Sequence, residues 1–155
     1  MDKRYIHYNS DVFDKERLKR ALTYNKKYRK FDKPFGLWAS PVDSQLGWKE
    51  WCECERFRLE SLEKSFTFTL SPEAKILTIN NLKDAASYVI EDCKELRDGR
   101  LDFYYDRLDL ANIYENYDAM EVNISNDYRF RNSVFHGWDV DSICIWNPDI
   151  ISTKN

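Results

Sequence analysis

Apolar residues follow two kinds of spacing along this chain, and each kind predicts a different element. The stretch Ser65 to Leu70 alternates without a break, which is typical of a half-buried strand. Met120, Val122 and Ile124 alternate in the same way, so they are expected to face the core while Glu121 faces the opposite side. The same pattern predicts further strands at Arg4–Asn9, Gly36–Ser40, Lys75–Ile79, Ala119–Ile124 and Val140–Trp146.

Helices are expected where apolar residues recur every three or four positions. Leu18, Ala21 and Leu22 form such a stripe and predict a helix over Asp14–Tyr24. Further helices are predicted at Leu46–Glu63, from Asn80 or Asn81 to Arg97 in one or two pieces stopped by Asp98-Gly99, and at Asp106–Tyr117, with Asn126–His136 irregular or a helical turn. This order predicts an α+β fold in which helices flank a mixed, mainly antiparallel sheet.

Composition supports a single domain over residues 1–155. The chain is 43% hydrophobic and 33% charged, which are globular values, and it has no low-complexity tract. Its first residues lack the apolar run of a signal peptide, and no stretch approaches the roughly 18 apolar residues that cross a bilayer. We therefore expect a cytoplasmic protein without membrane partners.

Charge is distributed unevenly. Residues 1–33 hold 11 Lys and Arg against 5 Asp and Glu, a balance of +6, whereas the whole chain carries −3. The basic segment 15–33 is the one place where nucleic acid would be expected to bind. Its charges lie largely on the predicted helix, where a solvated polar face is the commoner explanation. The acidic remainder also argues against a dedicated nucleic-acid binder.

Several familiar site classes have no basis in the sequence. Cys52 and Cys54 lie two apart on a predicted helix, and neither Cys93 nor Cys144 has a close second cysteine to complete a zinc site. We expect reduced, structural cysteines and no metal. The chain also lacks a Walker loop, a dinucleotide glycine fingerprint, a nucleophile elbow and a zinc-protease helix.

Aromatic residues and chain breakers concentrate between Lys33 and Trp51. This segment holds three of the five tryptophans, Trp38, Trp48 and Trp51. Large aromatic residues at the end of a short strand suit a flat ligand, and the ordinary alternative is that most of them are core. In that case Trp38 or Ser40 alone is free to bind.

Titratable candidates are few. His7 lies on the first strand and His136 in a loop, and two histidines could run acid and base chemistry on RNA. Glu121 is the carboxylate of most interest, because an acidic residue in mid-strand is unfavourable unless it faces solvent or a cleft. Asp139 and Asp141 flank the start of a strand, where turn roles are usual.

The order of these motifs resembles small ADP-ribosyltransferase-like domains of the kind encoded by phages and mobile elements. Tyr-Ile-His-Tyr-Asn-Ser, then Gly-Leu-Trp-Ala-Ser with an aromatic-rich helix, is similar to their opening. Phe66 to Leu70 with Lys75 to Ile79 looks like their central hairpin, and Tyr117 to Val122 looks like their Tyr-Asp-Gly strand. The stretch Ile143 to Ile151 looks like their closing strand and turn.

The resemblance implies NAD as a substrate and gives roles to individual residues. His7 would hydrogen-bond a ribose hydroxyl, Tyr8 would lie near the nicotinamide amide, and Trp38 or Ser40 would sit against the nicotinamide. Glu121, with His7, would be catalytic: its carboxylate would stabilise the oxocarbenium-like transition state and orient the nucleophile. Tyr8 stands where a small residue is often found, and Ala119 replaces the usual glycine.

Three functions follow as expectations. The first is an NAD-dependent ADP-ribosyltransferase that modifies a host macromolecule, foremost a protein, in the host cytoplasm. The second is a catalytically silent module of the same fold that inhibits a host partner by binding. The third is a ribonuclease that uses His7 and His136. Retained NAD affinity separates the first two.

Overall fold

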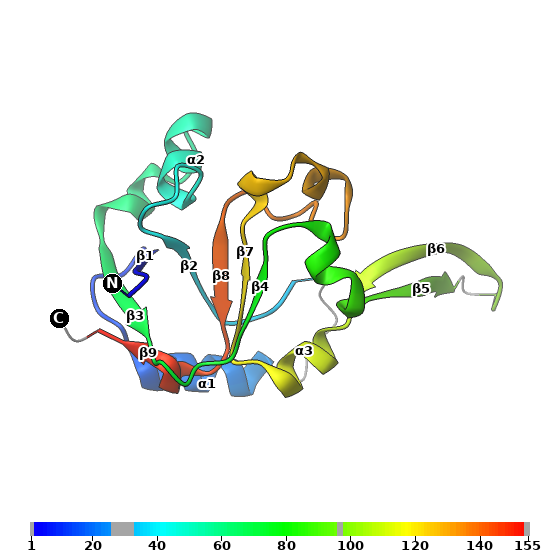
Figure 1. Cartoon of the computed structure of the whole chain (residues 1–155), viewed down its shortest axis with the longest axis horizontal. Coiled ribbons are helices and arrows are strands. Elements are labelled where there is room, and N and C mark those ends of the chain that lie inside the picture. Colours follow the sequence, from blue (N-terminus) through cyan, green and yellow to red (C-terminus); the bar gives the residue numbers. More distant parts are fainter. Residues whose placement is uncertain (1, 26–32, 96–97, 154–155) are drawn as a thin grey trace.

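The chain alternates short strands with short helices (Figure 1). The structure is a computed structural model and describes residues 2–25, 33–95 and 98–153. The strands are β1 (Tyr5–Tyr8), β2 (Leu37–Pro41), β3 (Ser65–Leu70), β4 (Ile76–Ile79), β5 (Val89–Glu95), β6 (Leu101–Leu108), β7 (Ala119–Val122), β8 (Ser142–Ile145) and β9 (Ile151–Ser152). The α-helices are α1 (Lys15–Asn25), α2 (Trp48–Glu55) and α3 (Leu110–Asn116). The 3₁₀ helices are η2 (Leu59–Glu63), η3 (Leu82–Tyr88), η4 (Ile124–Asn126), η5 (Tyr128–Asn132) and η6 (Pro148–Ile150).

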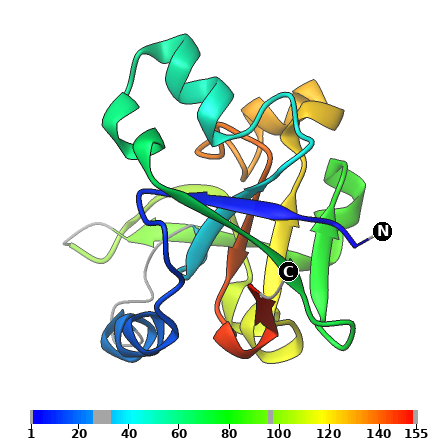
Figure 2. The ribbon, with the colours of Figure 1, turned by 90° about the vertical axis from the view of Figure 1, so that its left-hand side faces the viewer.

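Most described strands belong to one curled sheet in the order β4-β7-β8-β2-β1-β3-β9. Within the described residues, β4 and β7 are its one parallel pair. Strand β2 joins two halves of the sheet, β4-β7-β8 on one side and β1-β3-β9 on the other. Its residues Leu37–Ala39 pair with β8, whereas Ser40 and Pro41 pair with β1. Figure 2 shows the result, with β1 and β3 running across β2, β8 and β7.

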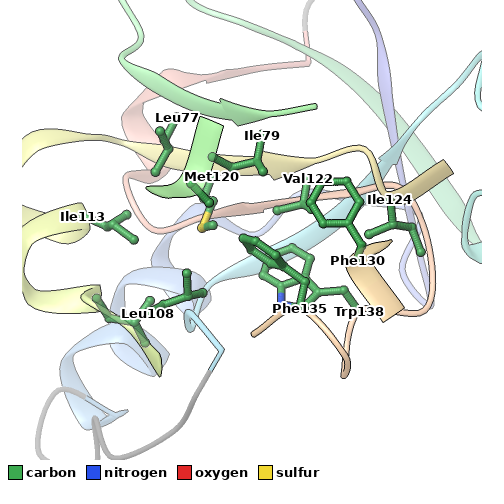
Figure 3. Close-up of a cluster of buried hydrophobic side chains, with 12 residues drawn as sticks. Leu77, Ile79, Leu108, Ile113, Met120, Val122, Ile124, Phe130, Phe135 and Trp138 are labelled. Carbon is green, nitrogen blue, oxygen red and sulfur yellow. The ribbon is translucent and has the colours of Figure 1, made fainter. Parts of the chain in front are cut away.

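Each face of this sheet carries its own hydrophobic cluster. The first lies on the face that the two halves share and contains Tyr5, Ala39, Phe68, Ala119, Ile143, Ile145 and Ile150. The second covers the opposite face of β4 and β7, where Ile79, Met120 and Val122 are fully buried beneath Phe130, Phe135 and Trp138 (Figure 3). Strand β7 is thus buried on both faces.

The predicted α+β fold with a mainly antiparallel sheet is confirmed. The strand at Ser65–Leu70 matches its prediction, and the helix expected over Asp14–Tyr24 is α1. Residues 26–32 of the basic segment 15–33 lie outside the described residues, as does the side chain of Cys93.

The prediction of a helical region from Asn80 to Arg97 is wrong for its second half. In the described part of this region, Leu82–Tyr88 is helical, and Val89–Glu95 forms β5, which pairs with β6 in a hairpin that projects from the body of the fold (Figure 1). Asp98-Gly99 is the turn of this hairpin, with Gly99 at φ 83°, and does not stop a helix. The helix predicted at Asp106–Tyr117 accordingly starts later, at Leu110.

The expected hairpin between Ser65–Leu70 and Lys75–Ile79 is also absent, because the two strands take other partners. Strand β4 pairs in parallel with β7, and β9 covers the edge of β3. Leu77 and Ile79 are buried in the same cluster as Met120 and Val122, which fixes β4 beside β7. The helix predicted at Leu46–Glu63 is divided as well, because Arg56 adopts a left-handed conformation that ends α2.

Candidate ligand-binding cleft

A cleft opens where β1 and β2 separate. The two strands pair at Tyr5 with Pro41 and at Ile6 with Ser40, and beyond these pairs the backbones diverge. The cavity has a volume of about 340 Å³, within the usual range for small-molecule sites. Its walls are Lys33, Ile6–Asn9, Trp38–Ser40, Trp48 of α2, Arg58, Ser61, and Trp138, Asp139, Val140 and Ser142 before and at the start of β8.

One end of the cleft is built from two indoles and an ammonium group. The rings of Trp38 and Trp138 meet edge to face with centroids 4.8 Å apart. The Nζ of Lys33 lies 5.6 Å from the Trp38 centroid and 5.9 Å from that of Trp138, within cation–π range. Trp138 Nε1 is buried and has no hydrogen-bond partner within the described residues.

The other end is polar and is held by backbone hydrogen bonds. The Asn9 N–H donates to the Ser61 carbonyl at 2.9 Å, and both the N–H and the hydroxyl of Ser61 donate to the Arg58 carbonyl. Asn9 and Arg58 have positive φ angles of 75° and 49°. Asparagine tolerates this conformation, whereas for arginine it is uncommon.

His7 links the two strands at the point where they separate. Its Nδ1 lies 2.6 Å from the Trp38 carbonyl oxygen. Because a carbonyl only accepts, Nδ1 carries the proton, and Nε2 of the neutral ring is an acceptor. Burial lowers the pKa of His7, and the bond to Trp38 opposes that shift only in part. The neutral ring can therefore accept a hydrogen bond from a ligand hydroxyl.

Ser40 and Tyr8 complete the wall nearest α2. The Ser40 hydroxyl accepts a hydrogen bond of 3.0 Å from the Trp48 N–H, which fixes the start of α2 against β2. Ser40 is buried, and Tyr8 is half-buried. Burial, followed by the charges of Glu50 and Glu53, raises the pKa of the Tyr8 hydroxyl, which therefore stays protonated.

Asp139 is the one carboxylate among the described residues that line the cleft. It is exposed, whereas Asp141 is buried and accepts hydrogen bonds from the Ser125 N–H and from the hydroxyls of Ser125 and Ser44. Asp141 thus holds the segment in place, and Asp139 is available to a ligand.

Glu121 is not among the residues that line the cleft. Its side chain is buried, with 3% of the residue exposed. One carboxylate oxygen accepts from the Tyr5 hydroxyl at 2.5 Å, and the other accepts from Lys3 Nζ at 2.9 Å and from Asn123 Nδ2 at 3.2 Å. The structure therefore gives Glu121 neither the solvent-facing nor the cleft-lining position that its sequence context suggested.

The two histidines are not brought together in the cleft. His136 is exposed, its Nδ1 lies 3.2 Å from the Ser133 carbonyl oxygen, and it does not line the cavity that His7 enters. A ribonuclease that uses both imidazoles on one phosphate has no support in this arrangement.

Among the lining residues, His7, Tyr8, Trp38 and Ser40 were predicted to contact a ligand. Those not predicted include Lys33, Arg58 and Trp138, and also Asp139, for which a turn role was expected. Arg58 lies in a stretch that reads as one continuous helix, and Trp138 and Asp139 lie in a loop. The one available signal was the short spacing between Trp138 and the last strand, which places an aromatic ring and a carboxylate at a strand end.

Comparisons with protein-family models, with curated proteins and with solved structures find no match for this chain. In the described residues, no three His, Cys, Asp or Glu side chains are grouped so that they could hold a metal ion. Nor does this part of the chain contain a helix of the length and apolar character needed to cross a membrane. The function has to be inferred from the cleft itself.

Proposed function

We propose that the chain is an NAD-dependent ADP-ribosyltransferase with an ADP-ribosyltransferase-like fold, and that it modifies a host protein in the host cytoplasm. One observation carries the proposal. The four residues assigned to NAD by the resemblance, His7, Tyr8, Trp38 and Ser40, come from two strands and line one cavity. The two indoles at one end of this cavity can bind a flat cationic ring by cation–π contact once the Lys33 ammonium, which lies 5.6 Å and 5.9 Å from their centroids, moves aside.

The cleft residues divide the chemistry between them. Trp38 and Trp138 hold the nicotinamide ring, and His7 Nε2 accepts a hydrogen bond from a ribose hydroxyl. The bond between the ribose C1′ and the nicotinamide nitrogen breaks, and its electron pair stays on the nitrogen, so that neutral nicotinamide leaves. Asp139 lies on the wall of the same cavity, where a carboxylate would stabilise the oxocarbenium-like ribose.

A nucleophile of the target protein then attacks C1′ and forms the new bond, and its proton passes to Asp139. This scheme moves the carboxylate role from Glu121 to Asp139, because Glu121 is bonded to Tyr5, Lys3 and Asn123 and does not line the cavity. Glu121 then acts by holding the two halves of the sheet together.

The position of Glu121 favours one second candidate. If the resemblance is correct in assigning catalysis to Glu121, a chain that buries this residue away from the cleft is a silent module, which inhibits a host partner by binding. Such a module would have no affinity for NAD, which separates it from the transferase.

The test is incubation of the purified chain with labelled NAD and a host-cell lysate, together with calorimetric titration of NAD. Wild type is compared with Asp139→Asn and with Asp106→Asn, a matched change at an exposed aspartate outside the cleft. We expect a labelled protein band that Asp139→Asn abolishes and Asp106→Asn retains. The absence of both label and NAD binding contradicts the proposed function and supports the silent module, and NAD binding without label contradicts transfer to a protein of the lysate.

A further inference from the structure

A strained arginine lies at the polar end of the cleft. Among the described residues other than glycine, Asn9, Arg56 and Arg58 have positive φ angles. Asparagine adopts this conformation readily, and Arg56 ends α2, where a left-handed residue is common. Arg58 has no such explanation, since it precedes η2 and no helix ends there. Strained residues of this kind are enriched at functional sites.

The strained turn places Arg58 among the residues that line the cleft. Its backbone carbonyl accepts two hydrogen bonds from Ser61, at 2.9 Å from the N–H and 2.7 Å from the hydroxyl, which fix the turn. The side chain is exposed and makes no ion pair or hydrogen bond within the described residues. An arginine in this state can bind an anion without first breaking an internal contact.

The charge of the cleft agrees with an anionic ligand group. Lys33 and Arg58 give its lining two positive charges, against the single carboxylate of Asp139, although the whole chain carries −3. Lys33 lies over the indole end, whereas Arg58 contacts Ser61 at the polar end. Lys33 thus supplies positive charge at the indole end itself, whereas Arg58 belongs to the polar end, away from the indoles.

We propose that Arg58 is a specificity-determining residue that holds a phosphate group of the ligand, so that the cleft selects a phosphorylated nicotinamide nucleotide over the unphosphorylated nucleoside. This inference rests on the proposed function. It adds a requirement that NAD binding alone does not impose, namely that recognition of the ring depends on a phosphate at the Arg58 end.

The test compares two probes that carry the same cationic ring and ribose, nicotinamide mononucleotide and nicotinamide riboside. Their dissociation constants are measured by calorimetry for the wild type, Arg58→Gly and Arg56→Gly. Glycine adopts a positive φ without strain, so neither substitution is expected to lower the melting temperature. Arg56→Gly is the matched control, because it relieves the same conformation outside the cleft.

We expect wild type and Arg56→Gly to bind the mononucleotide about tenfold more tightly than the riboside, the ratio expected for one hydrogen bond to a charged group. Arg58→Gly should bind the two probes about equally. Equal binding by wild type, or a preference that survives in Arg58→Gly, overturns the role of Arg58 and leaves the proposed function standing. Failure of both probes and of NAD to bind wild type overturns both.

Discussion

The hydroxyl of Tyr5 donates a 2.5 Å hydrogen bond to the carboxylate of Glu121, two residues that are 116 positions apart in the sequence. It joins β1 to β7, which are separated by two strands in the order of the sheet. Burial, and then the bond to Glu121, raises the pKa of the Tyr5 hydroxyl far above its usual range, so Tyr5 remains the donor. The contact therefore fastens the two halves of the curled sheet.

Removal of the Glu121 carboxylate should destabilise the fold. Glu121→Ala removes the acceptor of the buried Tyr5 hydroxyl and one acceptor of the Asn123 side-chain amide. We therefore expect the free energy of unfolding to fall by about 2–4 kcal/mol. Tyr5→Phe keeps the ring and loses the hydroxyl, so it should cost about 1–2 kcal/mol. Urea unfolding measures both. Loss of transfer at unchanged stability in Glu121→Ala would instead identify Glu121 as catalytic.

The depressed pKa of His7 predicts a specific dependence of stability on pH. The unfolded imidazole binds a proton near its ordinary pKa of 6.5, whereas the buried ring resists protonation. Below that pH the unfolded chain binds more protons, so the contribution of His7 to stability is lost as the pH falls toward its folded pKa. Between about pH 7.5 and about pH 5.5, His7→Gln should lose less stability than wild type in urea unfolding. Equal slopes in wild type and His7→Gln would contradict the assignment.

Ligand entry should be visible in tryptophan fluorescence. Three tryptophans line the cleft, Trp38, Trp48 and Trp138, whereas Trp51 packs on Trp48 and Phe57 outside it. Titration with NAD should change the emission of wild type, and Trp38→Phe should reduce the change. Trp51→Phe should retain it in full. A Trp38→Phe signal equal to that of wild type would remove Trp38 from the ligand site.

Two glycines should respond very differently to alanine. A Cβ at Gly36 would lie 2.2 Å from the Ile145 carbonyl oxygen, and this backbone cannot move without disrupting β8. Gly36→Ala should therefore destabilise the chain by about 3 kcal/mol. At Gly137 a Cβ would meet the flexible end of Lys33 at 3.1 Å, so Gly137→Ala should cost less than about 1 kcal/mol. Thermal unfolding of the two variants measures this difference, and equal losses of stability would contradict the prediction.

Local patterns in the sequence predicted local elements well and long-range pairings poorly. The alternation at Ser65–Leu70 and the stripe on α1 depend only on neighbours in the chain, and both predictions are confirmed. The choice of β7 as the partner of β4 depends on which cluster buries Leu77 and Ile79, which no local pattern contains. The hairpin of β5 and β6 did carry a signal, since Asp98-Gly99 is a typical hairpin turn between residues that favour strands.

In the cleft, too, features that depend on local sequence were predicted and features that depend on long-range contacts were not. His7 and Trp38 stand out in the sequence as a rare imidazole and a large aromatic on short strands, and the structure brings both to one cavity. The burial of Glu121 follows from the curling of the sheet, which places β1 opposite β7. Alternation along one strand cannot reveal that both faces of that strand are covered. The left-handed conformation of Arg58 could not be predicted from the sequence either, because a positive φ is normally expected at glycine.

The sharing of β2 between the two halves of the sheet also limits how the cleft can move. Leu37–Ala39 is paired with β8, and Ser40 and Pro41 are paired with β1, so one strand is attached to both walls. Neither wall can swing outward as a rigid body unless hydrogen bonds of β2 are broken. Admission of a ligand must then depend on rotamer changes of side chains such as Lys33 and Trp38. These changes take picoseconds to nanoseconds for exposed residues and are much faster than domain closure.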